Sequence, residues 1–551
     1  MCRDGIDLRD QNGAMTASAP RDLLLHSGRV VTPDRSPATA VLISDERILA
    51  VGGEEMVSAV GVGVARIDLQ GRLVTPAFVD AHVHSVQTGL LEVGLDLHGY
   101  RSREQVLDAV ATRLAAGRAA VLFGQGWDER AWPDPRPPTR SELDRAGGAS
   151  APVYLARVDV HSAVVSSALA DRIPGLSTEV GFRADGLLSQ DAHHRSRVAV
   201  NDLFSDGDRR AAARAALRGA AELGVGTLHE LGGPHLGPYE DLERVVSAAA
   251  EHGQSVVTYW GERATPSLID QVLADGVRGL AGDLCVDGAI GSRTAWLTEP
   301  YADAARAEVR AVGARYLTVD EIAAHLTLCT RAGLSGGFHC IGDAAVTAAV
   351  DGLERVAGEL GVEAVRRARH RLEHVELVTS AQIASLARLG AAASVQPAFD
   401  ATWGGRGELY EQRLGGVRGA TMNPLADWHR SGGVIAYGTD APVTPLAGWG
   451  MVADAVRHSR PDQRVGVGAA FAAATRGGHL AAGDTDAGLL VPGQRAQLVL
   501  WDTEPDSLDP SSGLPDLAAD GAPFPECAAL VVDGRVVFDP GGLLPRTADR
   551  S

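Results

Sequence analysis

The chain has 551 residues, of which 45% are hydrophobic and 22% are charged, a composition typical of a globular protein rather than a disordered one. Its formal charge of −19 disfavours nucleic acid or an anionic membrane surface as the main partner. The sequence contains no lysine, so its 51 basic residues are all arginine, which excludes Schiff-base and pyridoxal chemistry through a lysine.

Residues 1–20 contain no apolar core and no signal-peptide cleavage site, so we expect a disordered lead-in, with Met15 as an alternative start. No window approaches the roughly 20 apolar residues that span a bilayer, so we expect a soluble protein without a membrane partner. The five cysteines are irregularly spaced and indicate no disulfide framework, which favours a reducing, cytoplasmic location.

Both ends of the chain, residues 21–75 and 481–545, carry short β-like runs separated by turn residues, which predicts one composite β-sandwich. Between them, residues 76–480 alternate β-like runs with amphipathic helices, the pattern of parallel βαβ units. About eight such units would close a TIM-like (β/α)8 barrel, so the predicted fold class is α/β. Ten candidate strands exceed eight, so some belong to insertions, and we expect one insertion at about residues 161–201.

The first candidate barrel strand, AFVDAHVH, places Asp80, His82 and His84 on one face, because strand side chains alternate. At roughly 3.3 Å per residue, the two imidazoles lie about 7 Å apart along the strand and can chelate one metal ion. A His-x-His pair also arises by chance, so this motif alone does not establish a metal site.

Further polar residues fall at the C-terminal ends of later predicted strands: His339 in LSGGFHC, His374 in RHRLEHVEL and Asp440 in GVIAYGTDA. The C-terminal strand ends of a barrel open on one face, where active sites lie. We therefore predict that these three side chains converge with His82 and His84. The alternative interpretation treats each as a separate core polar group, with Asp440 capping a turn.

With these residues the chain resembles the amidohydrolase superfamily, whose pattern is His-x-His on the first strand, His on the fifth and sixth, and Asp on the eighth. More narrowly it resembles the YtcJ-like (amidohydrolase 3) branch, which includes N-substituted formamide deformylases. The segments that carry the resemblance are VTPAFVDAHVH, GQGWDERAWPDPRPPTRSELD, PVYLARVDVHSAVVSSALA, DGAIGSRTAWLTEPYAD, FHCIGDAA, RHRLEHVE, SVQPAF and YGTDAPVTP. The resemblance implies metal ligands at His82, His84, His339, His374 and Asp440.

The chain departs from many of these relatives on the fourth strand, where they carry a lysine that, once carboxylated, bridges two metals. Here GDLCVDG puts Asp283 near that position, and without a lysine no carbamate bridge can form. Asp283, Cys285 and Asp287 would share a strand face, and any of them could bind or bridge instead, a carboxylate bridge being preferred. We expect one or two divalent ions, zinc first, with iron or manganese as alternatives.

The resemblance implies a hydrolase of amide, formamide or similar C–N bonds in a small-molecule substrate. In the implied mechanism the metal generates hydroxide from bound water, and Asp440 accepts the proton and passes it to the leaving amine. His374 is a candidate to stabilise the developing oxyanion. A homodimer is the default expectation for the assembly.

Several residues outside the ligand set are candidates for the pocket. Trp127, Asp159 and His161 follow predicted strands, and Arg293 is placed to hold a substrate carbonyl or carboxylate. The alternative interpretations are that Trp127 packs in a loop, that His161 caps a helix and that Arg293 makes a structural ion pair. We expect the pair His193–His194, which falls in the insertion, to be solvated at the surface.

Two other functions remain open. A mononuclear deaminase of the same superfamily would use the same ligands, with a proton-shuttling acid close after the fifth-strand histidine. Here that acid is offered only by Asp343, displaced from the expected position, which ranks the deaminase lower. A non-catalytic barrel scaffold would be marked by loss of metal ligands, and none of the five is lost.

Overall fold

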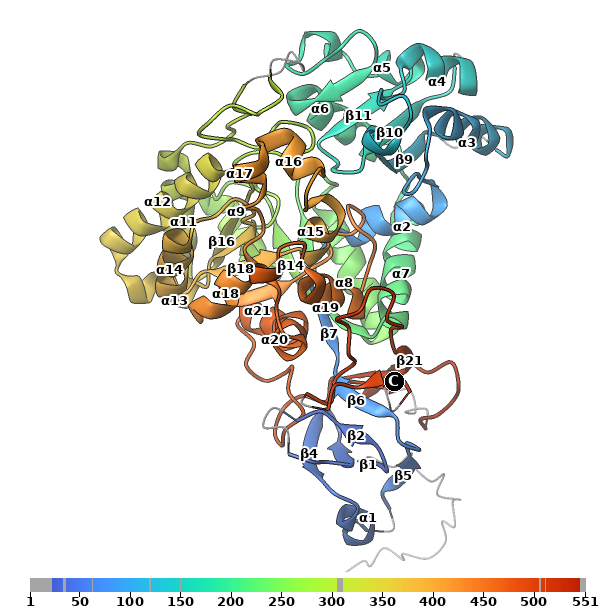
Figure 1. The fold of residues 1–551 in the computed structure, drawn as a ribbon, viewed down its shortest axis with the longest axis vertical. Helices are drawn as coiled ribbons and strands as arrows, with labels where there is room; N and C mark the ends of the chain where they lie inside the picture. The colour runs from blue at the N-terminus through green and yellow to red at the C-terminus, as the bar shows by residue number, and fades with distance from the viewer. Residues whose placement is uncertain are drawn as a thin grey trace, which may run out of the picture.

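The computed structural model describes residues 22–545 except 33–35, 62, 118–119, 149, 305–310, 505–506 and 511. The expected lead-in at residues 1–20 and the alternative start at Met15 lie outside the described residues. A barrel occupies the middle of the molecule, with an inserted lobe at one end and two small sheets at the other (Figure 1).

Eight parallel strands form the barrel, in the same order in space as along the chain. They are β7 (Phe78–Val83), β13 (Val225–Gly232), β14 (Ser255–Trp260), β15 (Gly279–Leu280), β16 (Ser335–Cys340), β17 (Arg371–His374), β18 (Ala392–Val395) and β19 (Ile435–Tyr437). The ring is nearly closed, because a parallel bridge joins Val83 of the first strand to Ala441 just after the last. The predicted α/β barrel is confirmed.

Helices connect the barrel strands, and some of them begin at a side-chain cap. They are α2 (Ser85–Val93), α7 (Asp206–Glu222), α8 (Glu240–His252), α9 (Pro266–Ala274), α11 (Val319–Ala332), α12 (Asp343–Leu360), α13 (Val362–Ala368), α14 (Ser380–Leu389) and α18 (Leu425–Ser431). The hydroxyl of Thr379, for example, accepts from the backbone of Gln382 and starts α14. None of the helices in the described part of the chain is long and apolar enough to cross a membrane.

Further short helices follow the last two barrel strands. After β18 come α15 (Pro397–Trp403), α16 (Leu409–Leu414) and α17 (Gly416–Gly419), and after β19 come α19 (Trp449–Arg457), α20 (Val467–Ala472), a π-helical turn (Ala473–Gly477) and α21 (Gly478–Ala482). The first group matters for function, because it reaches over the C-terminal end of the barrel.

The inserted lobe follows α2 and begins earlier than the sequence predicts. Its mixed sheet has the order β12 (Leu187–Ser189), β11 (Ser162–Val165), β10 (Val153–Arg157), β9 (Leu122–Trp127), β8 (Leu95–Asp96), and its helices are α3 (Arg103–Ala115), α4 (Arg140–Gly147), α5 (Ser167–Ala170) and α6 (Gln190–Asn201). The predicted start near residue 161 is wrong because β8, β9 and β10 are parallel and joined by helices, and so resemble barrel units in sequence.

Two small sheets lie below the barrel (Figure 1), and one of them combines strands from both ends of the chain, as predicted. One sheet has the order β4 (Arg47–Gly52), β3 (Ala40–Ser44), β1 (Asp22–His26), β5 (Ala65–Asp68), with α1 (Glu55–Ala59) beside it. The other has the order β2 (Arg29–Val30), β6 (Leu73–Pro76), β20 (Leu498–Asp502), β21 (Glu526–Val532), β22 (Arg535–Phe538). Both sheets contribute to one hydrophobic cluster that includes Leu25, Val74 and Leu498.

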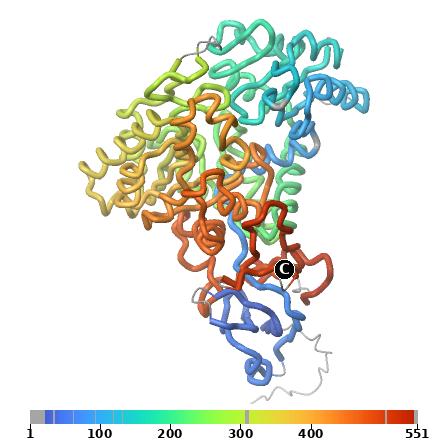
Figure 2. Tube along the Cα trace, viewed as in Figure 1, coloured from blue at the N-terminus to red at the C-terminus, as the bar shows by residue number. Residues whose placement is uncertain are grey.

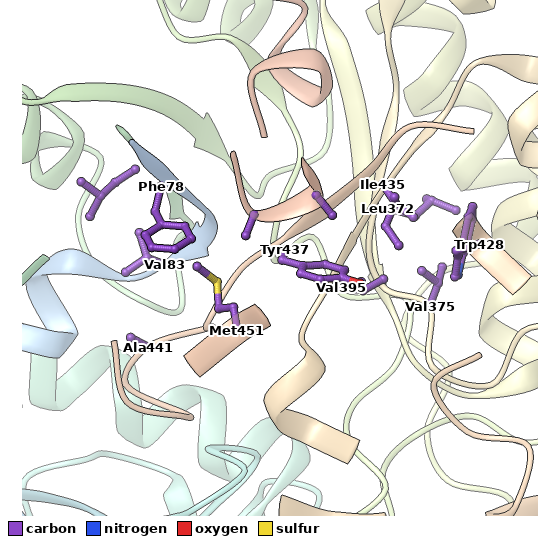
Figure 3. Packing of buried hydrophobic residues seen from close by; sticks show 14 of the residues in the cluster. Phe78, Val83, Leu372, Val375, Val395, Trp428, Ile435, Tyr437, Ala441 and Met451 are labelled. Carbon is purple, nitrogen blue, oxygen red and sulfur yellow. The ribbon is translucent and has the colours of Figure 1, made fainter. Parts of the chain in front are cut away.

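Strand β6 runs directly into the first barrel strand (Figure 2), and one face of its sheet belongs to the same hydrophobic cluster as the barrel. The ring of Phe78, at the start of β7, lies 5.1 Å from that of Trp449 and 5.8 Å from that of Trp501 in β20. On the barrel side, Figure 3 shows Phe78 near Met451 in the same cluster. This packing fixes the strand that carries the His-x-His motif.

Candidate metal centre and pocket

The seam between the first and last barrel strands brings three predicted ligands together. The backbone N–H of Asp440 donates to the carbonyl of His82 at 2.7 Å, and that of His84 donates to the carbonyl of the residue after Asp440 at 2.9 Å. The carboxylate of Asp80 accepts the backbone N–H of Thr439 at 2.9 Å and so fastens the same seam. Pairing of the backbone therefore places the motif beside Asp440.

The side chains of His82, His84 and Asp440 form a buried cluster that could hold a metal ion. Oδ1 of Asp440 lies 3.0 Å from Nε2 of His84 and 3.3 Å from Nε2 of His82. Asp440 adopts a left-handed backbone with φ of 56°, uncommon outside glycine. Such backbone strain is concentrated at functional sites.

A second group of potential ligands shares His82 and adds His374 and Asp283. The ring of His339 lies beside this group, with its centroid 4.5 Å from that of His374. The structure therefore brings the four predicted histidines together with Asp440 at the C-terminal end of the barrel.

Hydrogen bonds on the outer side of three rings fix which nitrogen faces the centre. Nδ1 of His82 lies 2.9 Å from Oε2 of Glu373, and Nδ1 of His84 lies 2.8 Å from the carbonyl oxygen of Leu231. Nδ1 of His374 lies 2.8 Å from Oε1 of Gln396. Each acceptor requires the proton on Nδ1, which leaves a lone pair on Nε2.

The inner nitrogens converge on the same space as the carboxylate of Asp440. Nε2 of His82 is buried and has no hydrogen-bond partner among the described residues, and Nε2 of His84 lies within hydrogen-bond distance of Oδ1 of Asp440, at 3.0 Å. When both rings are neutral, as a metal requires, two imidazole lone pairs and a carboxylate oxygen point at the same place. The residues present therefore fit a divalent metal held by two imidazoles and a carboxylate.

Asp283 occupies the place of the absent lysine. Its Oδ1 lies 3.6 Å from Nε2 of His82, and its Oδ2 lies 3.4 Å from Nε2 of His84. Asp287 instead accepts the backbone N–H groups of Trp296, Ile341 and Gly342 at 2.8, 3.0 and 2.8 Å, a structural role. Cys285 lines the pocket wall. Of the three residues that sequence left open, Asp283 faces His82 and His84, whereas a carboxylate oxygen of Asp287 lies 3.7 Å from Nδ1 of His339.

The electrostatics of the cluster suit a cation. Burial lowers the pKa of His82, but the carboxylates of Asp440 and Glu373 raise it, with a net value well above the ordinary one. Burial raises the pKa of Glu373, yet Arg371, at 2.8 Å, brings the net value below its usual range. Burial and the neighbouring His339 lower the pKa of His374 to about 3, so this ring is neutral at pH 7. Burial raises the pKa of Asp440 and of Asp283, but the neighbouring histidines bring both net values below the ordinary one, so both carboxylates are ionised at neutral pH.

The metal cluster opens into a pocket, which His84, Asp283 and Asp440 help to line. One wall is aromatic and comes from the segment after β18, which contributes Phe399, Trp403 and Tyr410. Phe399 stacks on His374 with ring centroids 5.7 Å apart and an interplanar angle of 10°. The other wall includes residues of the inserted lobe, which therefore covers the mouth of the barrel.

The four residues predicted for the pocket wall separate into two pairs. Asp159 and His161 line the pocket. Trp127 lies outside it, buried in the lobe, with its indole N–H donating to a backbone carbonyl at 2.9 Å. Arg293 also lies outside it and pairs with Asp303 at 2.6 Å. The alternative interpretation of an ion pair describes Arg293, whereas Trp127 is the last residue of β9 and therefore packs from a strand rather than from a loop.

The prediction of a solvated histidine pair in the insertion is wrong, because α6 packs against the mouth of the barrel. His193 is 1% exposed and its Nε2 lies 2.9 Å from the hydroxyl of Tyr154. His194 lines the pocket, as does Arg197 one turn later. These residues carried no recognisable sequence signal, because the insertion has no strand-end pattern to mark its inner face.

Sequence reasoning also missed a buried acid near the metal cluster. Glu376 follows His374 by two residues and lines the pocket, where the hydroxyl of Tyr410 donates to it at 2.5 Å. The segment EHVE contained the signal, since a second acid follows the strand-end histidine. Asp343, the displaced acid considered for a deaminase, is absent from the pocket wall and accepts the backbone N–H of Thr298 at 3.0 Å.

Comparison with known proteins gives matches over most of the chain. The amidohydrolase family model Amidohydro_3 matches residues 65–538. The protein LONG AFTER FAR-RED 3 of Arabidopsis thaliana is 26% identical over 533 residues, covering 88% of this chain and 87% of the relative. The amidohydrolase YtcJ of Bacillus subtilis, whose function is described as putative, is 26% identical over 407 residues, covering 69% and 72%.

Solved structures match as well. An uncharacterized metal-dependent hydrolase from Pyrococcus furiosus has 27% identity and a TM-score of 0.68, covering 88% of this chain and 99% of the other. Atrazine chlorohydrolase TrzN from Arthrobacter aurescens, complexed with zinc, has 16% identity and a TM-score of 0.52, covering 96% and 97%. The latter likeness supports the fold.

Proposed function

Because the chain belongs to the amidohydrolase family, we propose that it hydrolyses an amide- or formamide-type C–N bond of a small molecule. At the coarser level it is a metal-dependent hydrolase of the amidohydrolase superfamily with a His-His-Asp metal site. The observation that carries the proposal is the position of the Asp440 carboxylate, 3.0 Å from His84 Nε2 and on the pocket wall.

Each residue has a distinct part in the proposed reaction. His82, His84 and Asp440 would hold a divalent metal, with His374, His339 and Asp283 as the further donors. When bound, zinc, iron or manganese lowers the pKa of water and polarises a carbonyl. Asp440 accepts the proton of the attacking water and returns it to the leaving nitrogen. His374, with its proton on Nδ1 toward Gln396, is better suited to bind metal than to donate to an oxyanion.

The proposal is tested with a panel of N-alkyl and N-aryl formamides and acetamides, reading the released amine, on protein with metal content measured by plasma mass spectrometry. We expect Asp440→Asn to reduce kcat/KM by about 1000-fold while the metal stays largely bound, since general acid–base catalysis contributes roughly 10²–10⁴-fold. We expect His82→Ala to lose both metal and activity. Full activity in Asp440→Asn would refute its role as the proton carrier.

Deaminase activity is the second candidate, and the same assays distinguish it by ammonia release from amino-substituted heterocycles. Against it stands Asp343, which is held by Thr298 outside the pocket wall. Activity toward the heterocycles with none toward the amides would make the deaminase, and not the amide hydrolase, the function of this protein. Absence of both activities and of metal binding would favour the non-catalytic scaffold.

A further inference from the structure

One charged residue in the pocket lacks a partner of its own. Arg197, on α6 of the inserted lobe, is the single arginine among the residues that line the pocket. It is partly buried and, within the part of the chain that the structure describes, makes no ion pair or side-chain hydrogen bond. A guanidinium has five N–H donors, and in a substrate pocket without a protein acceptor these donors are free to bind a ligand.

The carboxylates that line the pocket are already engaged. Asp159 pairs with Arg157 at 2.9 Å and accepts the hydroxyl of Ser292 at 2.8 Å. Glu376 accepts the hydroxyl of Tyr410. The other two, Asp283 and Asp440, face the metal-binding histidines. The pocket therefore offers Arg197 no carboxylate of its own.

The surroundings of Arg197 leave its charge uncompensated. His194, one turn earlier on α6, lies with its ring centroid 5.4 Å from that of His235, and both line the pocket. Burial and the charge of Arg197 lower the pKa of His194 to about 4, so this ring is neutral at pH 7. A neutral imidazole can add a hydrogen bond beside the guanidinium without competing for an anion.

We propose that Arg197 binds a carboxylate of the substrate, so that the enzyme acts on N-acylated compounds bearing an acid group. This inference rests on the proposed function and adds the substrate class to it. The scissile bond then lies at the metal cluster, the carboxylate at Arg197 on the lobe, and an apolar group against Phe399 and Trp403 on the opposite wall. Arginine and carboxylate pair through two parallel N–H···O bonds, which fixes the substrate's orientation.

Binding is measured first, by calorimetry on the metal-loaded full chain, with 3-phenylpropionate and its uncharged amide as probes. We expect the carboxylate to bind at least 10-fold more tightly than the amide. In Arg197→Gln this preference falls to within twofold, and in Arg197→Lys it is partly kept, because lysine retains the charge without the planar fork. Arg195→Gln is the matched control, since Arg195 lies on the same helix but pairs with Glu179 outside the pocket.

A carboxylate could instead bind the metal directly, and the variants separate the two cases. If Arg197→Gln keeps the full preference, or if the wild-type protein binds both probes equally or neither, the proposal is overturned. Melting temperatures of the variants confirm that each is folded.

Kinetics with N-formylphenylalanine and N-formylphenylalaninamide separate this inference from the proposed function. We expect Arg197→Gln to raise KM for the acid at least 10-fold and to leave kcat/KM for the amide within twofold. Hydrolysis of both compounds at rates that Arg197→Gln does not change would refute the role of Arg197 and leave the proposed function intact. If the carboxylate probe still binds at Arg197 but neither formyl compound is hydrolysed, the proposed function is refuted and the role of Arg197 stands.

Discussion

Two histidines at opposite ends of one barrel strand have different tasks. His370 immediately precedes β17 and His374 ends it, and both are almost fully buried with a lowered pKa. At the N-terminal end, Nδ1 of His370 accepts the backbone N–H of Gly336 at 2.9 Å, and its Nε2 lies 2.9 Å from the hydroxyl of Thr330. At the C-terminal end, only one nitrogen of His374 has a protein partner, Gln396, among the described residues.

The comparison teaches that burial and residue type do not distinguish a ligand from a structural histidine. They are distinguished by whether both ring nitrogens have hydrogen-bond partners and by the end of the strand at which the ring lies. At one end of the barrel, polar groups satisfy one another, and at the other they leave lone pairs directed at a shared point. Substitutions at the two ends should therefore affect different measurements.

The largest stability effect is expected at Asp287, a structural residue at the metal end. Asp287→Ala leaves three backbone N–H groups without their charged acceptor and should lower the free energy of unfolding by about 3 kcal/mol. Asp283→Ala is the matched control, because one oxygen of Asp283 has no hydrogen-bond partner. It should reduce metal content and leave the stability of the metal-free chain nearly unchanged. Urea unfolding measures the stability and plasma mass spectrometry the metal content. Equal losses of stability in the two variants would contradict the structural role of Asp287.

A smaller effect is expected at Glu373, which orients a ligand from behind. Glu373→Gln removes the negative charge that faces Nδ1 of His82 at 2.9 Å and leaves Arg371 without its carboxylate. We expect metal affinity to fall about 10–100-fold, as is usual when the partner of a ligating histidine is changed. Competition with a chromophoric chelator measures it, and an unchanged affinity would show that His82 needs no such support.

The smallest effect is a pH dependence at the opposite end of the barrel. Burial lowers the pKa of His370 to about 4 from an ordinary 6.5, so the unfolded chain binds the proton more readily. Its contribution to stability is complete above pH 6.5 and is lost as the pH falls toward 4. At pH 5 the loss is about 2 kcal/mol.

This dependence is measured by denaturant unfolding of the wild type and His370→Gln at pH 7 and pH 5. The fall in stability between these values should be about 2 kcal/mol smaller in the variant. Any pH dependence of metal binding cancels in the difference between the two proteins. Identical falls would mean that His370 is protonated in the folded state.

The metal centre was predictable from sequence because barrel geometry converts strand ends into neighbours. His82, His84 and Asp440 follow from the β-like runs that end in them, and the structure joins these runs at the seam. The same logic failed for the start of the insertion, where β9 and β10 form a parallel pair outside the barrel. Local periodicity reports parallel packing but not the sheet to which a strand belongs.

The pocket walls were predicted less well, because they come from loops and from the inserted lobe. Arg197 lies in a helix whose arginines and histidines read as a solvated face, and only the docking of the lobe turns that face inward. Trp403 and Tyr410 belong to short helices with no strand end to mark them. Their roles depend on tertiary placement that no local pattern encodes.

The continuity of β6 with β7 has a consequence for synthesis of the protein. Pro76 in β6 pairs with Leu498 in β20, which the ribosome makes more than 400 residues later. At roughly 5–20 residues per second, that interval is about 20–80 seconds, during which β6 has an unpaired edge. Asp440 is made late as well, so the seam that holds His82 and His84 beside it cannot form early. The nascent chain must therefore acquire its metal near the end of translation or after release, when the last strands dock.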